Sequence, residues 1–506
     1  MLNVSPRRVR APNRLNTQAR ALWAVLLPAA CLAVLLTPLA APAESVPNAG
    51  FDQGDDAPTG WTLSGGTGRW VDRQVLEVTG SGAPNASNFW RCDGYAFQPG
   101  ALYHFEMRAR GAASGGCVVS GPSFANRDHH GMPNDWKWYG HVFRAPENTE
   151  GTYLRLGQWQ AKGTVAFDAV RVTRVLPVHR KIGELILGDG EMIRDGEYRF
   201  LGPFGHEGSN YHRTLERATA GFNSDRWTFG PGSEVVYRFE LPGRQFLAGD
   251  VSFNVNYHTR GGCTAEVSRD EKEWHSVATQ EGLGAGEAKL PADLLPAGTL
   301  FLRLRSSSDS SSFQINRIEF QAKLSGMPSE AAGETAYAEM SEDDSGLAVE
   351  RLTLGTSGSD GGRVMHVTVR NTTEESARIF PTTTVKQDDR SRSAGPDPFG
   401  PNVRPGETVT IAFGVPPLFS GKNELEFTLA ASKDAAARPK GRLTLNLPEF
   451  YRADYGRRLR VSSPDTVVWW CDAAHKIARG RAAPPQLDSG RGVRLQAARN
   501  DREAVQ

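Results

Sequence analysis

Tryptophan is concentrated in one part of this sequence. Ten tryptophans follow residue 43, and six of them lie within about one hundred positions: Trp61, Trp70, Trp90, Trp136, Trp138 and Trp159. A flat aromatic ring can stack on the apolar C–H face of a sugar while polar neighbours bind its hydroxyls. The alternative is that large rings fill a core. The cluster predicts either a sugar-binding surface or an aromatic core.

The neighbours of each ring help to separate these interpretations. Trp90 and Trp159 lie among amide and basic side chains, which favours an exposed position. We therefore expect Trp90, Trp138 and Trp159 to contact sugar, with Tyr95 and the loop 127–130 as weaker candidates. The loop contains two adjacent histidines, but no third metal ligand is near them in the sequence, so a solvated loop is the simpler interpretation.

No catalytic motif is complete. His206-Glu207 begins like the helix of a zinc protease, but the second histidine is missing and Gly208 is a poor helix former. The sequence has no nucleophile elbow, phosphate-binding loop or dinucleotide fingerprint. A glycosidase needs two acids at a set spacing across one bond, which a sequence does not reveal. We assign no catalytic residue.

Four cysteines follow the first 43 residues: Cys92, Cys117, Cys263 and Cys471. Cys92 and Cys117 fall in one predicted domain, so they could form a disulfide in an exported protein. Two buried thiols are the alternative, because the separation of the two residues decides the matter.

The first 43 residues have the pattern of an export signal. Five arginines precede an uncharged run from Ala21 to Leu39, which ends in the small-residue site Ala41-Pro42-Ala43. A retained membrane anchor is the alternative. We expect cleavage and an exported protein. The net charge is +1, and loss of the five arginines leaves −4, so no basic field remains for nucleic acid.

The rest of the chain is expected to be all-β. Short runs of alternating polar and apolar residues, such as 103–109, 165–172 and 364–371, are separated by Gly, Pro, Asn and Ser. Strand–helix alternation of the (α/β)₈ kind is missing. With 506 residues, several domains are required. We place sandwiches at 44–178, 182–325 and 345–447, a polar linker at 327–344, and an incomplete sandwich at 459–506.

Four segments of the first block, in order, resemble carbohydrate-binding modules of families 4, 9, 16 and 22. They are Asn48-Ala49-Gly50-Phe51-Asp52 with Pro58-Thr59-Gly60-Trp61, then Pro99-Gly100-Ala101-Leu102-Tyr103, then Trp136 with Tyr139 and Phe143, and finally Val165-Ala166-Phe167-Asp168-Ala169-Val170. The resemblance implies a jelly roll that binds a polysaccharide or glycan. Because Trp61 and Trp136 stand on the motif positions, we expect these two in the core.

The same resemblance implies a structural Ca²⁺. In these modules the ion is held by oxygens of the opening motif and the final strand, which carries over to Asp52 and Asp168 here. Oxygen ligands are those that Ca²⁺ prefers. Asp52 stands where the families often have a longer Glu, and two exposed acids are the alternative.

Two further blocks resemble common sandwich domains. The run from Ala265 to Trp274, with Ser268-Arg269-Asp270 at its turn, is similar to discoidin-like and other galactose-binding-like jelly rolls. The strands of 345–447 resemble the immunoglobulin-like spacers of exported bacterial proteins. The expected architecture is thus two jelly rolls followed by an immunoglobulin-like sandwich.

The final segment resembles the N-terminal sandwich of family 123 glycoside hydrolases. Val467-Val468-Trp469-Trp470 and the run Ala497-Ala498-Arg499-Asn500-Asp501-Arg502-Glu503 carry the similarity. The sequence stops within a run that should continue as a strand, so we expect a catalytic barrel to follow in a longer parent. The resemblance implies an accessory, carbohydrate-binding front part of a hydrolase. A surface adhesion or scaffold protein that binds protein partners is the alternative.

Overall fold

The computed structural model describes residues 45–447 except 112, 206–207, 329, 342–345, 357–361, 396–399, 420 and 431–439, together with short strands between 451 and 494. Strands dominate these residues, and the one helix among them is a single 3₁₀ turn, η1 (Ala292–Leu294). The prediction of an all-β protein with several sandwiches is confirmed. None of the described helices has the length and apolar character needed to cross a bilayer. The predicted export signal lies outside the described residues.

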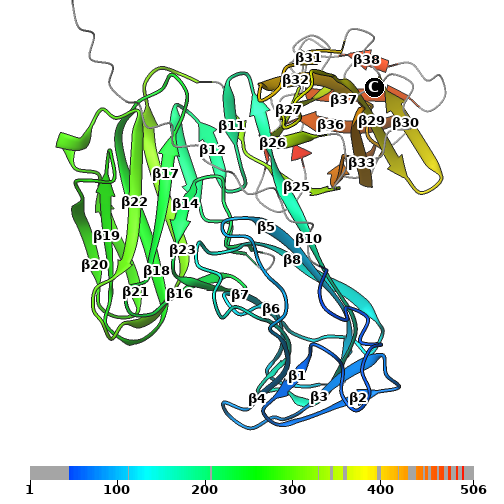
Figure 1. The fold of residues 1–506 in the computed structure, drawn as a ribbon. Coiled ribbons are helices and arrows are strands. Elements are labelled where there is room, and N and C mark those ends of the chain that lie inside the picture. Colours follow the sequence, from blue (N-terminus) through cyan, green and yellow to red (C-terminus); the bar gives the residue numbers. More distant parts are fainter. Residues whose placement is uncertain are drawn as a thin grey trace, which may run out of the picture. The chain divides into compact units, whose positions relative to one another are not determined.

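The first sandwich packs two antiparallel sheets face to face (Figure 1). One sheet has the order β1 (Thr62–Ser64), β4 (Ser87–Cys92), β9 (Leu154–Trp159), β6 (Cys117–Pro122) and β7 (Ala125–His129). The other has the order β2 (Thr67–Val71), β3 (Val75–Ser81), β10 (Lys162–Ile182), β5 (Leu102–Gly111) and β8 (Lys137–Arg144).

The alternation of β5 explains how this sandwich forms. Tyr103, Phe105, Met107 and Ala109 are buried and point into the core, while the residues between them point outward. Successive side chains of a strand lie on opposite faces, so this sequence buries one face and leaves the other polar. The polar face carries the candidate site.

The second sandwich also has two sheets. The first contains β15 (Gly221–Asn223), β16 (Arg226–Phe229), β23 (Ser312–Leu324), β13 (Glu197–Leu201), β12 (Glu191–Arg194) and β24 (Ala331–Ala332), with β18 (Phe246–Arg260) and β21 (Gly284–Lys289) beside β23. The second contains β14 (Leu215–Ala218), β17 (Glu234–Glu240), β22 (Thr299–Ser306), β19 (Cys263–Ser268) and β20 (His275–Gln280). A short parallel pairing of β7 with β15 joins the first two sandwiches.

A third sandwich has its own core and is built around the end of β10. On one side of β10 lie β25 (Thr335–Met340), β34 (Gly441–Leu447), β33 (Gly421–Ala430), β29 (Phe380–Gln387) and β30 (Arg390–Ala394). On the other side lie β26 (Leu347–Thr356), β27 (Arg363–Asn371) and β32 (Thr408–Val415). Two short pairings, β10 with β11 (Leu185–Leu187) and β28 (Ala377–Arg378) with β31 (Asn402–Val403), complete the set.

The segment 327–344 differs from the linker that the sequence predicted. It contains β24 and β25, and β25 is hydrogen-bonded between β10 and β34. The strand is thus an internal part of a sheet. After residue 450, in a region that includes the sandwich predicted at 459–506, the structure describes only backbone strands. These are β35 (Tyr451–Ala453), β36 (Arg457–Ser463), β37 (Thr466–Cys471) and β38 (Ile477–Arg479) in one sheet, and β39 (Gln486–Leu487) with β40 (Val493–Arg494) in another.

Candidate functional site

The outward face of the β5 sheet carries a strip of aromatic and charged side chains. On β5 these are His104, Glu106, Arg108 and Arg110. Cross-strand partners share a face of a sheet, so the pairing of Trp138 with Arg108 places that ring in the strip. The strip is therefore fixed by the registers of β5 with β8 and β10.

Two tryptophans lie at one end of this strip. Trp138, on β8, is 47% exposed. Trp136 precedes β8 and is half-buried, with the guanidinium carbon of Arg110 at 4.7 Å from its ring centre. Trp136 was expected in the core, and the structure instead leaves it partly accessible. The two rings offer apolar faces beside charged groups.

Two ion pairs continue the strip from the tryptophans. Arg171 lies 5.0 Å from the centre of the Trp138 ring, and its Nε is 3.3 Å from Glu106 Oε2. The backbone bulge between Phe167 and Ala169 turns Asp168 toward Arg108, and the two form a 2.8 Å pair. Planar guanidinium and carboxylate groups are well shaped to bind vicinal hydroxyls.

Asp168 has an unusual environment for a carboxylate. Burial raises its pKa, and the nearby Arg108 works against this. Its Oδ2 accepts the hydrogen bond from Arg108, while its Oδ1 is buried and has no hydrogen-bond partner among the described residues. A buried acceptor without a partner costs stability, so Asp168 is an unsatisfied group of the described fold.

Trp159 lies on the outer face of the opposite sheet. It is 43% exposed, nearly as accessible as Trp138. Its cross-strand neighbours are Ser87 on β4 and Cys117 on β6, and neither is charged. The two exposed rings of the first sandwich therefore differ in their polar surroundings, although both were predicted from the sequence to contact sugar.

Trp90 and Tyr95, also predicted to contact sugar, are buried instead. Trp90 is 6% exposed and its Nε1 donates to the carbonyl of Glu77. Tyr95 is 5% exposed and packs edge-on against Phe97. Neither ring face is open to a ligand. The polar neighbour Asn88 misled the prediction because it is itself buried, where its amide donates to two carbonyls.

The segment 127–130 is mostly strand, whereas a solvated loop was expected. Its first three residues belong to β7. The two histidines make separate contacts: His129 Nε2 is 2.9 Å from Ser120 Oγ, and His130 Nδ1 is 3.0 Å from the carbonyl of Gly116. The segment supports the joint between the sandwiches, since the backbone N–H of Asp128 donates to Ser224 Oγ.

Cys92 and Cys117 are free, buried thiols, so the predicted disulfide is wrong. Cys92 lies opposite Leu154, and Cys117 lies opposite Trp159, at the two ends of β9. Five residues of strand separate those positions, or roughly 16 Å, while a disulfide needs Cα atoms within about 7 Å. Burial raises the pKa of the Cys117 thiol to about 12.

The two acids predicted to hold calcium are not in a close group of three His, Cys, Asp or Glu side chains among the described residues. Asp52 is exposed, and Asp168 pairs with Arg108. In the opening loop, the carbonyls of Gln53 and Thr59 accept hydrogen bonds from the amide of Asn48. Calcium takes six to eight oxygens. Around Asn48 these carbonyl oxygens accept hydrogen bonds from the protein's own amide.

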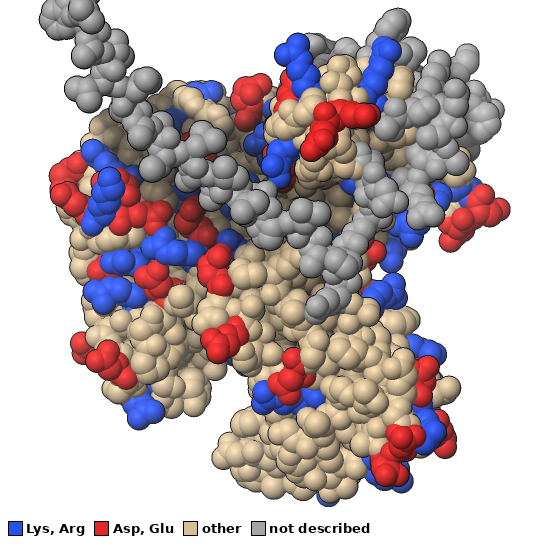
Figure 2. Space-filling model, in the orientation of Figure 1, with Lys and Arg blue, Asp and Glu red and all other residues tan. Residues whose placement is uncertain are grey.

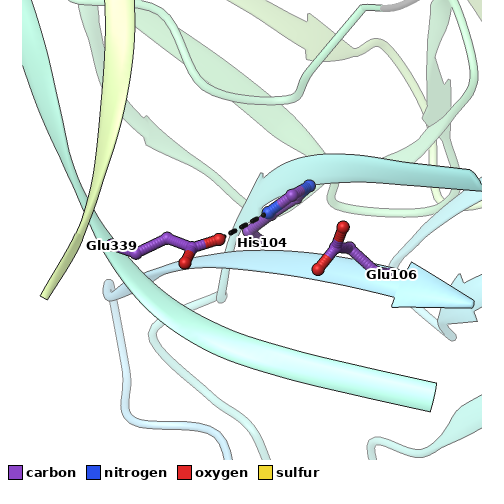
Figure 3. A group of neighbouring side chains, drawn as sticks. All are labelled: His104, Glu106 and Glu339. Carbon is purple, nitrogen blue, oxygen red and sulfur yellow. Dashed lines mark hydrogen bonds and ion pairs between the residues drawn. The ribbon is translucent and has the colours of Figure 1, made fainter. Parts of the chain in front are cut away.

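A different group of metal-ligating side chains lies at the far end of the strip (Figure 3). Among the described residues, His104, Glu106 and Glu339 form the one group of three whose ligand atoms all lie within 4.8 Å of one another. His104 and Glu106 come from β5, and Glu339 comes from β25. No sequence motif marks this group, because 235 residues separate His104 from Glu339.

Comparison with known proteins adds little to this picture. No protein family matches the sequence, and no curated protein matches it either. The solved structures that are similar include a tandem pair of family 22 carbohydrate-binding modules of Paenibacillus barcinonensis Xyn10C (12% identity, 55% of this chain and 98% of that chain, TM-score 0.21). Others are a GH2 β-galacturonidase of Eisenbergiella tayi (10% identity, 48% and 38%, TM-score 0.16) and β-glucuronidase 2 of Bacteroides uniformis (12% identity, 48% and 28%, TM-score 0.16).

These TM-scores are too low to carry an argument. The chain also spans less than half the length of the two hydrolases. The fold therefore rests on the strand pairings described above, and the site rests on the chemistry of its residues.

Proposed function

We propose that the first sandwich binds carbohydrate on the outward face of β5, β8 and β10. The observation that carries this proposal is the exposed ring of Trp138 beside Trp136, flanked by the Arg171–Glu106 and Arg108–Asp168 pairs. Aromatic rings cover the apolar face of a sugar, and the charged groups can exchange hydrogen bonds with its hydroxyls. The four sequence segments that resemble carbohydrate-binding modules support the same function.

The wider role follows from the resemblance at both ends of the sequence. We propose that the protein is exported and is the carbohydrate-binding, accessory front part of a glycoside hydrolase-like protein. Adhesion to a protein partner is the competing function. A large apolar patch would favour adhesion, whereas the strip on β5 is rich in charge.

The test is affinity electrophoresis of the full chain in gels that contain single polysaccharides. We expect at least one glycan to retard the wild-type chain. Trp138→Ala should weaken that retardation about tenfold or more, equivalent to about 1.4 kcal/mol. The free energy of unfolding of the Trp138→Ala variant should change by less than about 0.5 kcal/mol, because the ring is on the surface.

Trp159→Ala is the matched control, since its ring is almost equally exposed on the opposite sheet. Retardation that survives Trp138→Ala and is lost in Trp159→Ala would transfer the site to the β9 sheet. If no glycan in a broad panel retards the chain, the adhesion function becomes the better one.

Calcium at Asp52 and Asp168 stays a prediction and is tested separately. If the ion is bound, a chelator should lower the melting temperature of the wild type, because a ligand of the native state adds stability. Asp168→Asn should remove that difference. Equal melting curves with and without chelator would contradict a calcium site.

A further inference from the structure

His104, Glu106 and Glu339 are brought together by the registers of one sheet. On β10, Thr173 lies opposite His104, Arg171 lies opposite Glu106, and Val175 lies opposite Glu339. Residues 171, 173 and 175 alternate along the strand and share its outward face. The side chains of His104, Glu106 and Glu339 therefore lie on the same face of the sheet. Figure 3 shows Glu339 approaching His104 from across β10.

The space beside the two β5 residues is kept open by a glycine. Gly140, on β8, lies opposite Glu106. A Cβ at position 140 would lie 2.8 Å from the backbone oxygen of Phe105, 3.0 Å from His104 Nε2 and 3.1 Å from Glu106 Cγ. Any larger residue would force His104 or Glu106 to move. Gly140 thus permits the imidazole and the carboxylate to stand side by side.

The distance between His104 and Glu339 is long for a hydrogen bond. His104 Nδ1 and Glu339 Oε1 are 3.3 Å apart, outside the usual range of about 2.7–3.2 Å. Two neighbouring ligands of a tetrahedral zinc ion, each about 2.0–2.1 Å from the metal, are separated by roughly 3.3–3.4 Å. The observed spacing, which is that of a long hydrogen bond, also fits two adjacent metal ligands.

A polar pocket also borders His104. The pocket has a volume of about 220 Å³, and its lining includes His104, His141, His212, Asp189 and Tyr337. His141 is 8% exposed; its Nε2 lies 2.9 Å from the carbonyl of Ala125, and its Nδ1 is buried without a partner. Both ring nitrogens of His212 also lack partners. His141 faces the interior of the sandwich, because its cross-strand partner is the buried Phe105, so these nitrogens belong to the pocket and not to the face that carries Glu106 and Glu339.

We propose that His104, Glu106 and Glu339 bind a divalent transition-metal ion of the zinc type, with water completing its coordination. An imidazole nitrogen with two carboxylates suits zinc better than calcium, which takes oxygen ligands. The two carboxylates balance the charge of the ion, and Arg171 holds Glu106 through the Nε–Oε2 contact. The ion links β5 of the first sandwich to β25 of the third.

Glu106 also belongs to the strip proposed to bind carbohydrate, so the test measures the metal directly, without a glycan. The full chain is stripped with chelator, dialysed against Zn²⁺ and analysed for bound metal, and Zn²⁺ is then titrated by calorimetry. We expect one Zn²⁺ per chain and a melting temperature that rises with Zn²⁺ concentration. The rise with Zn²⁺ should be lost in His104→Asn, whereas any rise with Ca²⁺ should be the same in that variant and in the wild type.

Three substitutions test the ligands. Glu106→Gln, Glu339→Gln and His104→Asn should each weaken Zn²⁺ binding by about tenfold or more. Gly140→Ala should weaken it as well, by crowding His104. The matched control is Asp293→Asn, because Asp293 forms a second histidine–carboxylate contact, with His275 Nδ1 at 4.0 Å. That variant should bind Zn²⁺ as the wild type does.

Two outcomes would overturn the proposal. One is a wild-type chain that retains no Zn²⁺ after dialysis, which would leave an ordinary hydrogen-bonded pair. The other is Zn²⁺ binding that is equal in the wild type and in the glutamine variants, which would place the ion elsewhere. The glutamine variants keep the shape of the side chain, and their melting curves without metal show whether they fold.

Discussion

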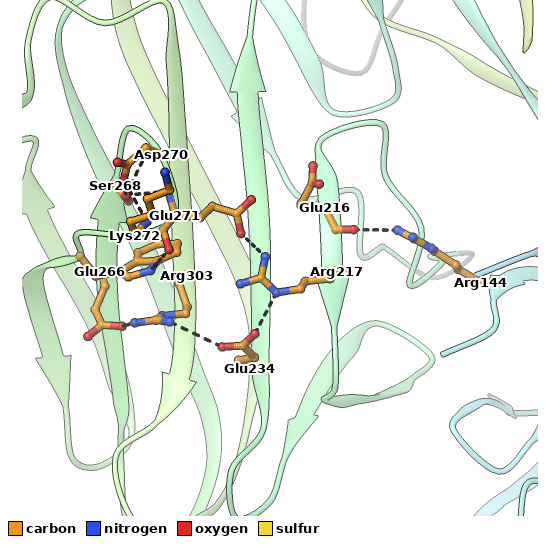
Figure 4. A network of polar contacts seen from close by, with 11 residues as sticks. Arg144, Glu216, Arg217, Glu234, Glu266, Ser268, Asp270, Glu271, Lys272 and Arg303 are labelled. Carbon is orange, nitrogen blue, oxygen red and sulfur yellow. Dashed lines mark hydrogen bonds and ion pairs between the residues drawn. The ribbon is translucent and has the colours of Figure 1, made fainter. Parts of the chain in front are cut away.

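The first and second sandwiches both have outer faces on which charges pair with one another, but their tryptophans differ in exposure. On the sheet of β17, β19 and β22, acidic and basic side chains form ion pairs with one another. Arg217 contacts Glu234 and Glu271, and Arg303 binds Glu266 at 2.7 Å (Figure 4). Acidic and basic side chains are interspersed over this sheet (Figure 2). Its tryptophan is covered as well, because the Arg303 guanidinium lies 4.1 Å from the centre of the Trp274 ring.

The first sandwich leaves two of its tryptophan rings, Trp138 and Trp159, accessible. Trp138 is 47% exposed beside its arginine, and Asp168 keeps one carboxylate oxygen without a partner among the described residues. The number of charges therefore does not distinguish a binding face from a structural one. What distinguishes them is whether the protein itself satisfies those groups.

Among the substitutions that test this comparison, the largest loss of stability is expected at Glu191. Its carboxylate is 1% exposed and accepts two 2.6 Å bonds from Arg213 and one from the hydroxyl of Tyr198. Glu191→Ala leaves a buried arginine uncompensated and should cost about 3–5 kcal/mol in urea unfolding. Glu240→Ala, which removes an exposed partner of Arg238, should cost less than about 1 kcal/mol. A loss at Glu191 as small as that of the control would contradict the contrast.

A smaller loss of stability is expected at low pH, from the histidines that line the polar pocket beside His104, among them His141 and His212. Burial lowers the pKa of His141 to about 4 and that of His212 to about 3. The unfolded chain therefore binds protons first as the pH falls below about 6.5. The contribution of the neutral histidines to the free energy of unfolding is fully present above about pH 6.5. It is lost as the pH falls toward 4, and for His141 the loss amounts to up to about 3 kcal/mol.

Urea unfolding between pH 7 and pH 4.5 measures this dependence. His212→Phe should make it shallower, because the phenyl ring can pack against Phe200, Phe204 and Tyr237 without a proton equilibrium. A wild-type free energy of unfolding that is constant over the range would show that the pocket histidines are protonated without penalty.

The smallest effect is expected within the closed network itself. Arg217 is 37% exposed and contacts two acids. Arg217→Ala should cost no more than about 1 kcal/mol, because exposed ion pairs are screened by solvent. It should also leave glycan retardation unchanged. Weaker retardation in this variant would mean that the second sandwich takes part in binding.

Much of the strand structure was predictable because alternation is a local signal. The run 103–109 lies inside β5, and 364–371 lies inside β27. The full length of β10 was not predicted. Its sequence from Val175 to Ile182 includes Pro177 and several charged residues, and those residues are in a strand because β25 and β26 flank them. Pairing with distant strands overrides the local pattern.

The site was predictable only in part for the same reason. Trp138 was predicted from its type, and the structure exposes it. The sequence could not show that Trp90 is buried while Trp138 is exposed. Its neighbour Asn88 is of a type usually found on the surface, but it is buried in the fold. Glu339 was missed entirely, since its approach to His104 depends on a register between strands far apart in the chain.

The 21 residues of β10 have a consequence for how such proteins can be rearranged in evolution. Modules that are joined by loose linkers can be duplicated, lost or exchanged by recombination at the linker. Here a crossover near residue 178 would cut a strand that pairs with β5 before that point and with β25 and β26 around it. Each fragment would inherit an unpaired edge, which favours aggregation. The first and third sandwiches are therefore expected to be inherited together, so that their lineages share one history.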